Sequence, residues 1–177
     1  MSDIRDQQPI EALLPDLAEG VETAYAALYD RLGARMFRAA VAMLRSHQDA
    51  EDVVQEVFMN LYRARESLAR VENLTGYVFA TLRHAATKRM RKLGAARRAI
   101  EAAADAARLH GAPPPADGLG SALDALPAPQ REAIALKIDA GLTFAEIGAA
   151  LAISPNTAAS RYRYALEKLR ATLGREA

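Results

Sequence analysis

A stretch of ten residues, located just beyond the middle of the chain, divides it into two parts. Residues 111–120 read Gly-Ala-Pro-Pro-Pro-Ala-Asp-Gly-Leu-Gly. Three consecutive prolines cannot continue a helix, because proline lacks the backbone N–H and clashes with the preceding turn. On both sides of this stretch, apolar residues recur every three or four positions, which is the period of a helix face. The pattern predicts an all-α protein, with two small helical domains joined by a flexible linker.

Composition along the chain predicts four segments. Residues 1–21 form an acidic N-terminal extension, 22–94 a first domain, 95–120 a linker rich in Ala, Pro and Gly, and 121–175 a second domain. The chain of 177 residues is long enough for two small domains. In the extension, four apolar residues have the spacing of a short amphipathic helix that packs on the body or covers a basic face: Ile10, Leu13, Leu14 and Leu17.

The absence of cysteine excludes disulfides, thiolate metal sites and cysteine nucleophiles. The three histidines lie far apart, and no glycine-rich phosphate loop is present. No run of about 18 apolar residues occurs, and the N-terminus lacks the pattern of a signal peptide. We therefore expect a cytoplasmic protein with no metal site, no cofactor, no catalytic residues and no membrane insertion.

The net charge is only +1, but it is unevenly distributed. Residues 60–98 carry a net charge of +8, residues 99–153 carry −4, and residues 154–177 carry +3. Two basic blocks separated by an acidic one indicate two separate contacts with anionic partners. The alternative is that these basic helix faces are simply solvated.

The last third of the chain has the pattern of a helix-turn-helix. Thr143 and Glu146 form a capping box at the start of one helix, and Ser154-Pro155 begins the next. The second helix is expected to bury Ala158, Tyr162, Ala165 and Leu169. Its front then carries side chains that can bond base edges and phosphates: Ser154, Asn156, Thr157, Ser160, Arg161, Arg163 and Tyr164. A plain helical hairpin is the alternative, and Ala152 stands in the turn where glycine is often found.

An acidic helix is predicted within residues 49–65 of the first domain. The face opposite its apolar stripe carries Asp52, Gln55, Glu56 and Met59, and Asp49 lies at its start. A solvated face does not need Met59, whereas a docking face does. A simple solvated acidic stripe is the alternative. No His or Ser set accompanies these carboxylates, so they do not predict acid–base catalysis.

A basic helix is predicted from about residue 73 to about residue 92. Gly94, two residues later, is expected to end or bend it. Arg83, His84, Thr87 and Arg91 share one face, and Lys88 adds charge beside it. Two aromatic residues on this helix are candidates for contact with a base. Tyr77 is assigned to the core, and Phe79 is left unassigned. The Ala-rich stretch after the glycine can also be helical.

These patterns, in this order, resemble the extracytoplasmic-function (ECF) group of bacterial sigma-70 factors. Residues 49–58 read DAEDVVQEVF, which is similar to the "DAEDLVQEVF" stretch of sigma region 2. Residues 123–127 (LDALP) and 141–148 (GLTFAEIG) are similar to sigma region 4, as are Ser160-Arg161 and Leu169-Arg170. The resemblance implies an alternative sigma factor that binds core RNA polymerase and directs promoter recognition and opening in transcription initiation.

The resemblance also implies roles for the three helices. The acidic helix would bind the β′ clamp helices of the polymerase, and the β subunit is a further implied partner. The basic helix would hold and melt the −10 element, and the recognition helix would enter the major groove at −35. The linker would thread the polymerase channel. Promoter DNA and an anti-sigma factor complete the implied partners.

The chain departs from the family pattern at several of these positions. Tyr77-Val78 stands for the usual Trp-Leu, His84 for a common Asn and Lys88 for a common Asp. In the recognition helix, Ala159 stands for a usual Lys, and Tyr164-Ala165-Leu166 stands for a usual Arg-Ala-Arg, so three expected basic residues are absent. These departures predict an unusual −10 sequence and a shallower salt dependence of −35 binding. Two rival functions remain open: a helix-turn-helix DNA-binding regulator that does not dock on polymerase, and a sigma-like adaptor that binds only protein.

Overall fold

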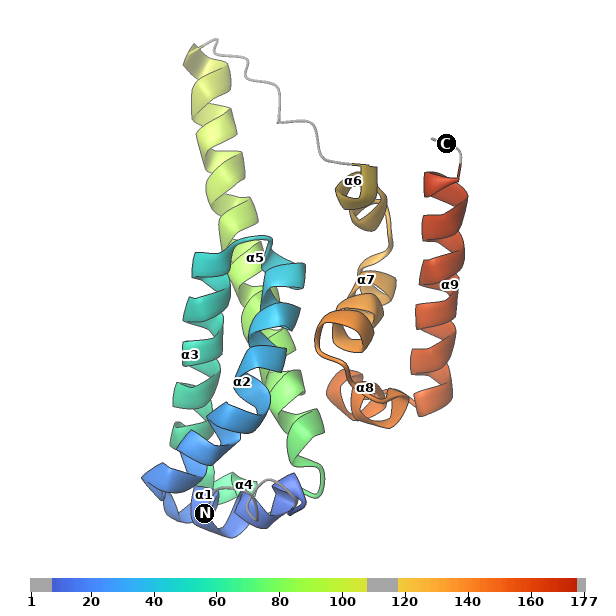
Figure 1. Ribbon diagram of the computed structural model, residues 1–177. Coiled ribbons are helices and arrows are strands. Elements are labelled where there is room, and N and C mark those ends of the chain that lie inside the picture. Colours follow the sequence, from blue (N-terminus) through green and yellow to red (C-terminus); the bar gives the residue numbers. More distant parts are fainter. Residues whose placement is uncertain (1–7, 108–117, 175–177) are drawn as a thin grey trace.

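The computed structural model describes residues 8–107 and 118–174, and within these ranges all regular structure is helical (Figure 1). The all-α prediction is therefore confirmed. The first part contains η1 (Ile10–Leu13), α1 (Leu14–Glu19), α2 (Glu22–Leu44), α3 (His47–Arg63), α4 (Arg65–Leu68) and α5 (Leu74–Ala107). The second part contains α6 (Gly118–Asp124), α7 (Ala128–Ile134), the π-helical turn η2 (Ala135–Asp139), α8 (Phe144–Leu151) and α9 (Pro155–Leu173).

Helices α2, α3 and α5 form a bundle, and side-chain caps lie at the starts of α3 and α5. The backbone N–H of Asp49 donates to Ser46 Oγ at 3.2 Å, which confirms Ser46 as the N-cap of α3. At the start of α5, the N–H of Gly76 donates to Asn73 Oδ1 at 2.6 Å. These bonds satisfy backbone donors that have no partner inside a helix.

Helix α5 is longer than the sequence pattern predicted. It runs through Gly94 and ends at Ala107, so it occupies the first half of the expected linker. One glycine costs a helix about 1 kcal/mol, and the alanine-rich residues that follow offset this cost. In Figure 1, the far part of α5 projects beyond the ends of α2 and α3.

The N-terminal segment packs on the bundle, as its apolar spacing suggested. Helix α1 contacts α4 and α2, and the Leu17 side chain is fully buried. The Tyr25 hydroxyl donates to the carbonyl oxygen of Leu17 at 3.0 Å, which ties α1 to α2. Whether residues 1–7 take part lies outside the described residues.

The second part begins earlier than expected, with α6. This short helix starts at Gly118, inside the stretch that the sequence assigned to the linker. Ala122 of α6 is buried in a small cluster with Leu126, Ile134, Ala165 and Leu169. The sequence did not predict α6 because the helix contains Gly118 and Gly120. Glycine disfavours a helix unless tertiary packing stabilises it.

The predicted caps of the helix-turn-helix are confirmed. The N–H of Thr143 donates to Glu146 Oε2 at 2.7 Å, and the N–H of Glu146 donates to Thr143 Oγ1 at 3.2 Å. The N–H of Thr157 donates to Ser154 Oγ at 3.1 Å, and Gly174 is the C-cap of α9. Helix α8 also needs Gly148, because a Cβ there would lie 2.8 Å from the carbonyl oxygen of Ile153.

One apolar residue of this part lies outside the core. The apolar sequence after Pro127 predicts that Ile138 is buried together with Ile134 and Leu136, but it is 57% exposed. It lies in η2, whose π-helical turn is wider than an α-helical turn. The wider turn shifts the phase of the side chains that follow, so the apolar spacing no longer predicts the buried face.

One continuous apolar core joins the two parts of the chain. Leu136, Leu142 and Ile147 of the second part belong to the same buried cluster as Leu28 and Leu82 of the first. Helix α8 lies against α5, and η2 lies against α2. The sequence analysis expected two linked domains and did not foresee this contact. No helix in the described ranges has both the length and the apolar character needed to cross a membrane.

The turn between α8 and α9 holds a residue in a strained conformation. Ala152 is the C-cap of α8 with φ 53°, in the left-handed region that favours glycine. Since a Cβ costs about 1–2 kcal/mol there, we expect Ala152→Gly to raise the free energy of unfolding by about 0.5–1 kcal/mol. Urea unfolding followed by circular dichroism measures this.

The control is Ala145→Gly, at an exposed helical position in α8. That change is expected to lower the free energy of unfolding by about 0.5–1 kcal/mol. A loss of stability in both variants would contradict the strain at Ala152.

Candidate functional site

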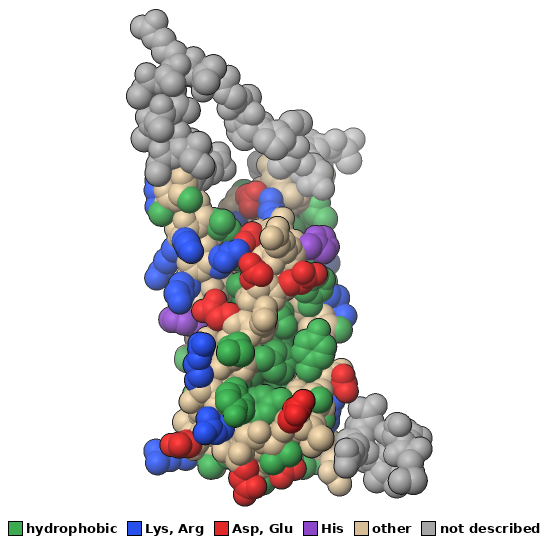
Figure 2. Space-filling view, turned by 90° about the vertical axis from the view of Figure 1, so that its left-hand side faces the viewer, with side chains coloured by type: hydrophobic (Ala, Val, Ile, Leu, Met, Phe, Trp, Pro, Cys, Tyr) green, Lys and Arg blue, Asp and Glu red, His purple; other side chains and the backbone are tan. Residues whose placement is uncertain are grey.

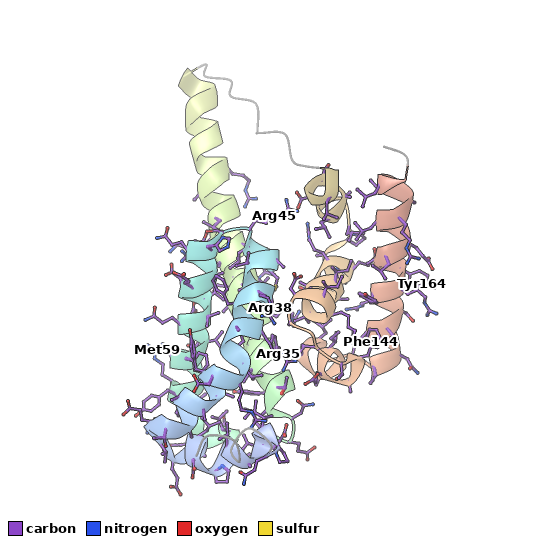
Figure 3. All side chains as sticks on the ribbon, viewed as in Figure 1. Arg35, Arg38, Arg45, Met59, Phe144 and Tyr164 are labelled. Atoms are coloured by element: carbon purple, nitrogen blue, oxygen red, sulfur yellow. The ribbon has the colours of Figure 1, made fainter. Side chains whose placement is uncertain are left out.

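The outer face of α3 carries exposed acidic residues together with an exposed methionine. The side chain of Asp52 is 52% exposed, Met59 is 48% exposed, and Gln55 is also exposed. Figure 2 shows this side of the molecule, where apolar side chains gather at the centre with acidic ones around them and basic ones along one edge. Figure 3 shows Met59 pointing outward from α3.

Beside this face, a groove of about 480 Å³ opens between α2 and α3. Its apolar walls come from Tyr29 and Phe37 of α2 and from Val54 and Phe58 of α3. The Tyr29 and Phe58 rings lie 5.4 Å apart between centroids. A groove of this kind suits the apolar face of a partner helix, and acids at its rim suit a partner with basic flanks.

Sequence analysis missed the contribution of α2 to this groove. Tyr29 and Phe37 are separated from the acidic helix by the end of α2 and the turn at Ser46, so no local motif links them to it. The exposure of Tyr29 depends on how α2 packs against α3, so the spacing of apolar residues alone could not reveal it.

Asp49 differs from its expected neighbours on α3. Its side chain is only 16% exposed, and Arg89 Nε of α5 donates to Asp49 Oδ1 at 2.7 Å. Arg89 Nη2 also donates to Asp52 Oδ2 at 3.0 Å, and Lys88 Nζ lies 3.5 Å from Glu56 Oε1. The basic edge of α5 therefore partly neutralises the acidic face of α3. Asp49 joins two helices and offers little surface to a partner.

The predicted −10 residues on α5 do not form one open surface. His84, Lys88 and Arg91 are exposed, and Thr87 is half-buried. Arg83 is also half-buried, and its Nη1 lies 3.8 Å from Glu132 Oε2 of α7.

The two aromatic candidates on α5 differ in burial. Phe79 is completely buried, whereas Tyr77 is half-buried at the edge of the core. The assignment of Tyr77 to the core is therefore correct only in part. Phe79 is the residue that fills the core, and its burial removes it as a stacking partner for a base in this arrangement.

The predicted −35 residues lie along α9, on the side of the second part that faces away from the first (Figure 1). Asn156, Thr157, Arg163 and Tyr164 are exposed, and Figure 3 shows Tyr164 pointing outward. Ser160 and Arg161 are half-buried, and Arg163 Nη2 donates to Ser160 Oγ at 3.3 Å.

Ser154 has the capping place that the sequence predicted, whereas Tyr162 of α9 differs from its expected place. Ser154 Oγ accepts the N–H of Thr157, so it acts first as the helix cap. Tyr162 was expected to be buried, but it is half-buried, and its ring contacts that of Phe144 in α8 at 5.8 Å.

The titratable residues of the described ranges form no metal site. No group of three or more His, Asp or Glu residues there is arranged to hold a metal ion. His47 lies at the start of α3, with its ring 5.8 Å from that of Phe37. His110 lies outside the described residues.

The Asp49–Arg89 pair makes stability depend on acid pH. The Ser46 hydroxyl and then the Arg89 guanidinium hold the pKa of Asp49 below its usual value. A lowered pKa contributes stability above the pKa of the unfolded chain, about 3.9, and this contribution is lost as the pH falls through the folded value. We expect Asp49→Asn to lower the urea-unfolding midpoint at pH 7, and this deficit to shrink below about pH 4.

The control for this prediction is Glu51→Gln, which removes an exposed carboxylate from the same helix. Its deficit at pH 7 should be smaller. An Asp49→Asn deficit of constant size from pH 7 to pH 3 would mean that the ionised pair does not stabilise the fold.

Two family models match the chain, one in each part. The model for sigma-70 region 2 matches residues 28–96, and the model for sigma-70 region 4 matches residues 122–171. Region 2 and region 4 are used below for these two ranges. Region 2 contains α3 and the basic part of α5, and region 4 contains the helix-turn-helix.

Individual proteins agree with these matches. The chain is 29% identical to the ECF RNA polymerase sigma factor SigK of Mycolicibacterium vanbaalenii, over 93% of this chain and 89% of the relative. The structure of CnrH in complex with the cytosolic domain of CnrY covers 94% of this chain and 98% of that chain, with a TM-score of 0.71 and 23% identity.

A second solved structure is that of the sigma factor RpoE in complex with the anti-sigma factor NepR from Bartonella quintana. It covers 92% of each chain, with a TM-score of 0.55 and 25% identity. Both family models, the curated relatives and the arrangement of the helices agree. The chain belongs to the ECF subfamily of sigma-70 RNA polymerase sigma factors, a family of transcription initiation factors.

Proposed function

We propose that region 2 of this sigma factor docks on core RNA polymerase through the α3 face and the groove beside it. The observation that carries the proposal is the exposed Met59 on an acidic helix next to an apolar groove of about 480 Å³. Asp52, Gln55 and Glu56 supply polar and charged contacts, and the groove supplies apolar area. The partner surface is the pair of β′ clamp helices, and the β subunit provides further contacts.

Promoter DNA is bound by two separate helices in this proposal. His84, Lys88 and Arg91 of α5 contact the −10 element, together with Thr87 and, once it is released from Glu132, Arg83. Asn156, Thr157, Arg163 and Tyr164 of α9 enter the major groove at −35, and Ser160 and Arg161 lie beside them. The protein is cytoplasmic and has no catalytic activity of its own, because the polymerase performs the chemistry.

A protein that holds the sigma factor inactive is a further proposed partner. Support comes from the solved relative that is bound to an anti-sigma factor, RpoE with NepR. The same apolar groove between α2 and α3 is a suitable surface for an apolar helix of such a partner. Polymerase and the anti-sigma factor would then compete for it.

The docking proposal is tested by charge reversal on α3. Asp52→Arg/Glu56→Arg should weaken binding to core RNA polymerase by about 2 kcal/mol or more, roughly 30-fold, because it replaces attractive contacts with repulsive ones. Titration of labelled sigma factor with purified bacterial core enzyme measures the loss.

The matched control is Glu19→Arg/Glu66→Arg, which makes the same change in net charge at exposed acids on α1 and α4. It should bind core enzyme nearly as the native chain does. Equal binding by both double variants would remove the α3 face from the docking site. Absence of binding by the native chain would favour a regulator that acts without polymerase.

The −35 proposal predicts a specific salt effect. Arg163→Ala should weaken holoenzyme binding to a promoter, and lower the slope of log affinity against log salt by about one unit if Arg163 neutralises one phosphate. Lys168→Ala is the control, since it removes the same charge from α9 more than one turn further from the N-terminal end of the helix. An unchanged slope for Arg163→Ala would place this side chain away from the DNA backbone.

A further inference from the structure

Helix α5 contains a long run of residues without a single acid. Residues 73–100 include seven Lys or Arg residues and one His, and no Asp or Glu. Such a helix attracts phosphates along its length, but phosphate contacts carry no sequence information. A helix that recognises one promoter element also needs a side chain that reaches the edge of a base.

The aromatic and hydroxyl side chains of α5 are poorly placed for this task. Phe79 is completely buried, and Tyr77 is half-buried at the edge of the core. Thr81 Oγ1 donates to the carbonyl oxygen of Tyr77 at 2.9 Å, so its hydroxyl is already bonded. Thr87 is half-buried and short, and the longer basic side chains beside it keep it from a base edge.

Two basic side chains of α5 are bonded to the acidic face of α3. Arg89 Nη2 donates to Asp52 Oδ2 at 3.0 Å, and Lys88 Nζ lies 3.5 Å from Glu56 Oε1. The ammonium group of a lysine is moreover a point charge with rotating donors, which suits a phosphate better than one particular base. We therefore do not assign base reading to either side chain.

Arg83 is held on another side of the helix. Its Nη1 lies 3.8 Å from Glu132 Oε2 of α7, and its Nε is buried. A half-buried guanidinium in this position does not extend into solvent beside α5.

His84 and Arg91 remain as exposed side chains on one line of α5. Within the described part of the chain, neither makes an ion pair or a side-chain hydrogen bond. They are seven residues apart, so they lie within about 20° of each other around the helix and about 10 Å apart along its axis. Three base-pair steps also extend over about 10 Å. A helix lying along the DNA would place these side chains three bases apart.

The chemistry of the two side chains divides their roles. The guanidinium of Arg91 can bond a phosphate through two parallel N–H groups, and such contacts fix the position of a helix on DNA. The imidazole of His84 keeps at least one N–H donor in each of its protonation states. Guanine presents two adjacent acceptors, O6 and N7, whereas adenine presents one acceptor beside a donor. A lone N–H donor therefore favours guanine.

We infer that His84 is the residue of α5 that reads a base of the −10 element, and that the base it favours is guanine. Arg91 positions His84 by bonding the DNA backbone. The inference rests on the proposed function, in which α5 contacts the −10 element.

The experiment uses the holoenzyme formed by the full chain and purified bacterial core RNA polymerase. The native holoenzyme first selects promoters from a pool of duplexes with a randomised segment, which defines the −10 element. Each base of that element is then replaced by the other three, and binding is measured for the native chain, His84→Asn and His84→Ala. Lys92→Ala is the control, since it removes an exposed cation of α5 about 100° around the helix from Arg91.

We expect the native holoenzyme to favour guanine over adenine by roughly 5-fold at one position of the −10 element, as one hydrogen bond allows. His84→Asn should favour adenine at the same position by about 10-fold, because a carboxamide bonds N6 and N7 of adenine together. His84→Ala should lose the preference at this position alone. Lys92→Ala should keep every base preference of the native chain. Circular dichroism melting verifies that each variant is folded.

Three results would overturn the inference. Equal base preferences in the native chain and both His84 variants would mean that this side chain reads no base. A native preference for a base other than guanine at the position that His84→Asn alters would refute the assignment of guanine. A change in Lys92→Ala as large as that in His84→Asn would mean that the preferences report the charge of α5. By contrast, a native holoenzyme that selects no promoter would refute the proposed function, and the inference with it.

Discussion

The arrangement of this sigma factor depends on the close approach of α8 to α5. That approach is possible because Gly76 has no side chain where the Cβ of Ala149 lies. Once the two backbones are this close, Leu142 and Ile147 leave water and enter the core of region 2. The bonds from Arg35 and Arg38 then form at the rim, where the carbonyls at the end of η2 need donors. Gly76 therefore permits the close packing of the two regions, and Arg35 and Arg38 add hydrogen bonds at its rim.

Charge complementarity organises the other side of region 2. The acidic face of α3 lies beside the basic edge of α5, and Arg89 bonds both Asp49 and Asp52. The helix proposed for polymerase docking is thus joined directly to the helix proposed for −10 binding. Because ion pairs between exposed groups contribute little individually, this arrangement leaves Asp52 and Glu56 free to exchange partners. Asp49, whose side chain is mostly buried, instead keeps its bond to Arg89 and joins α3 to α5.

The two helices proposed to bind DNA, α5 and α9, differ in their surroundings. Helix α9 turns its polar front to solvent on the far side of region 4, whereas the half-buried Arg83 of α5 lies beside Glu132 of α7. The apolar groove between α2 and α3 is not covered by region 4, since its walls come from α2 and α3 alone. A protein partner can therefore reach this groove while the two regions are packed together.

The sequence by itself determined the features that depend on neighbouring residues. The caps at Ser46 and Ser154 and the capping box of Thr143 and Glu146 are bonds across three positions, so a local pattern predicts them. The same holds for the all-α class and for the acidic and recognition helices. Only the tertiary structure decided the rest: the groove shared by α2 and α3, the pairing of Asp49 with Arg89, and the contact of Arg83 with Glu132 of α7. These contacts join residues far apart in the chain, and their geometry depends on how whole helices pack, which the period of a single helix does not encode.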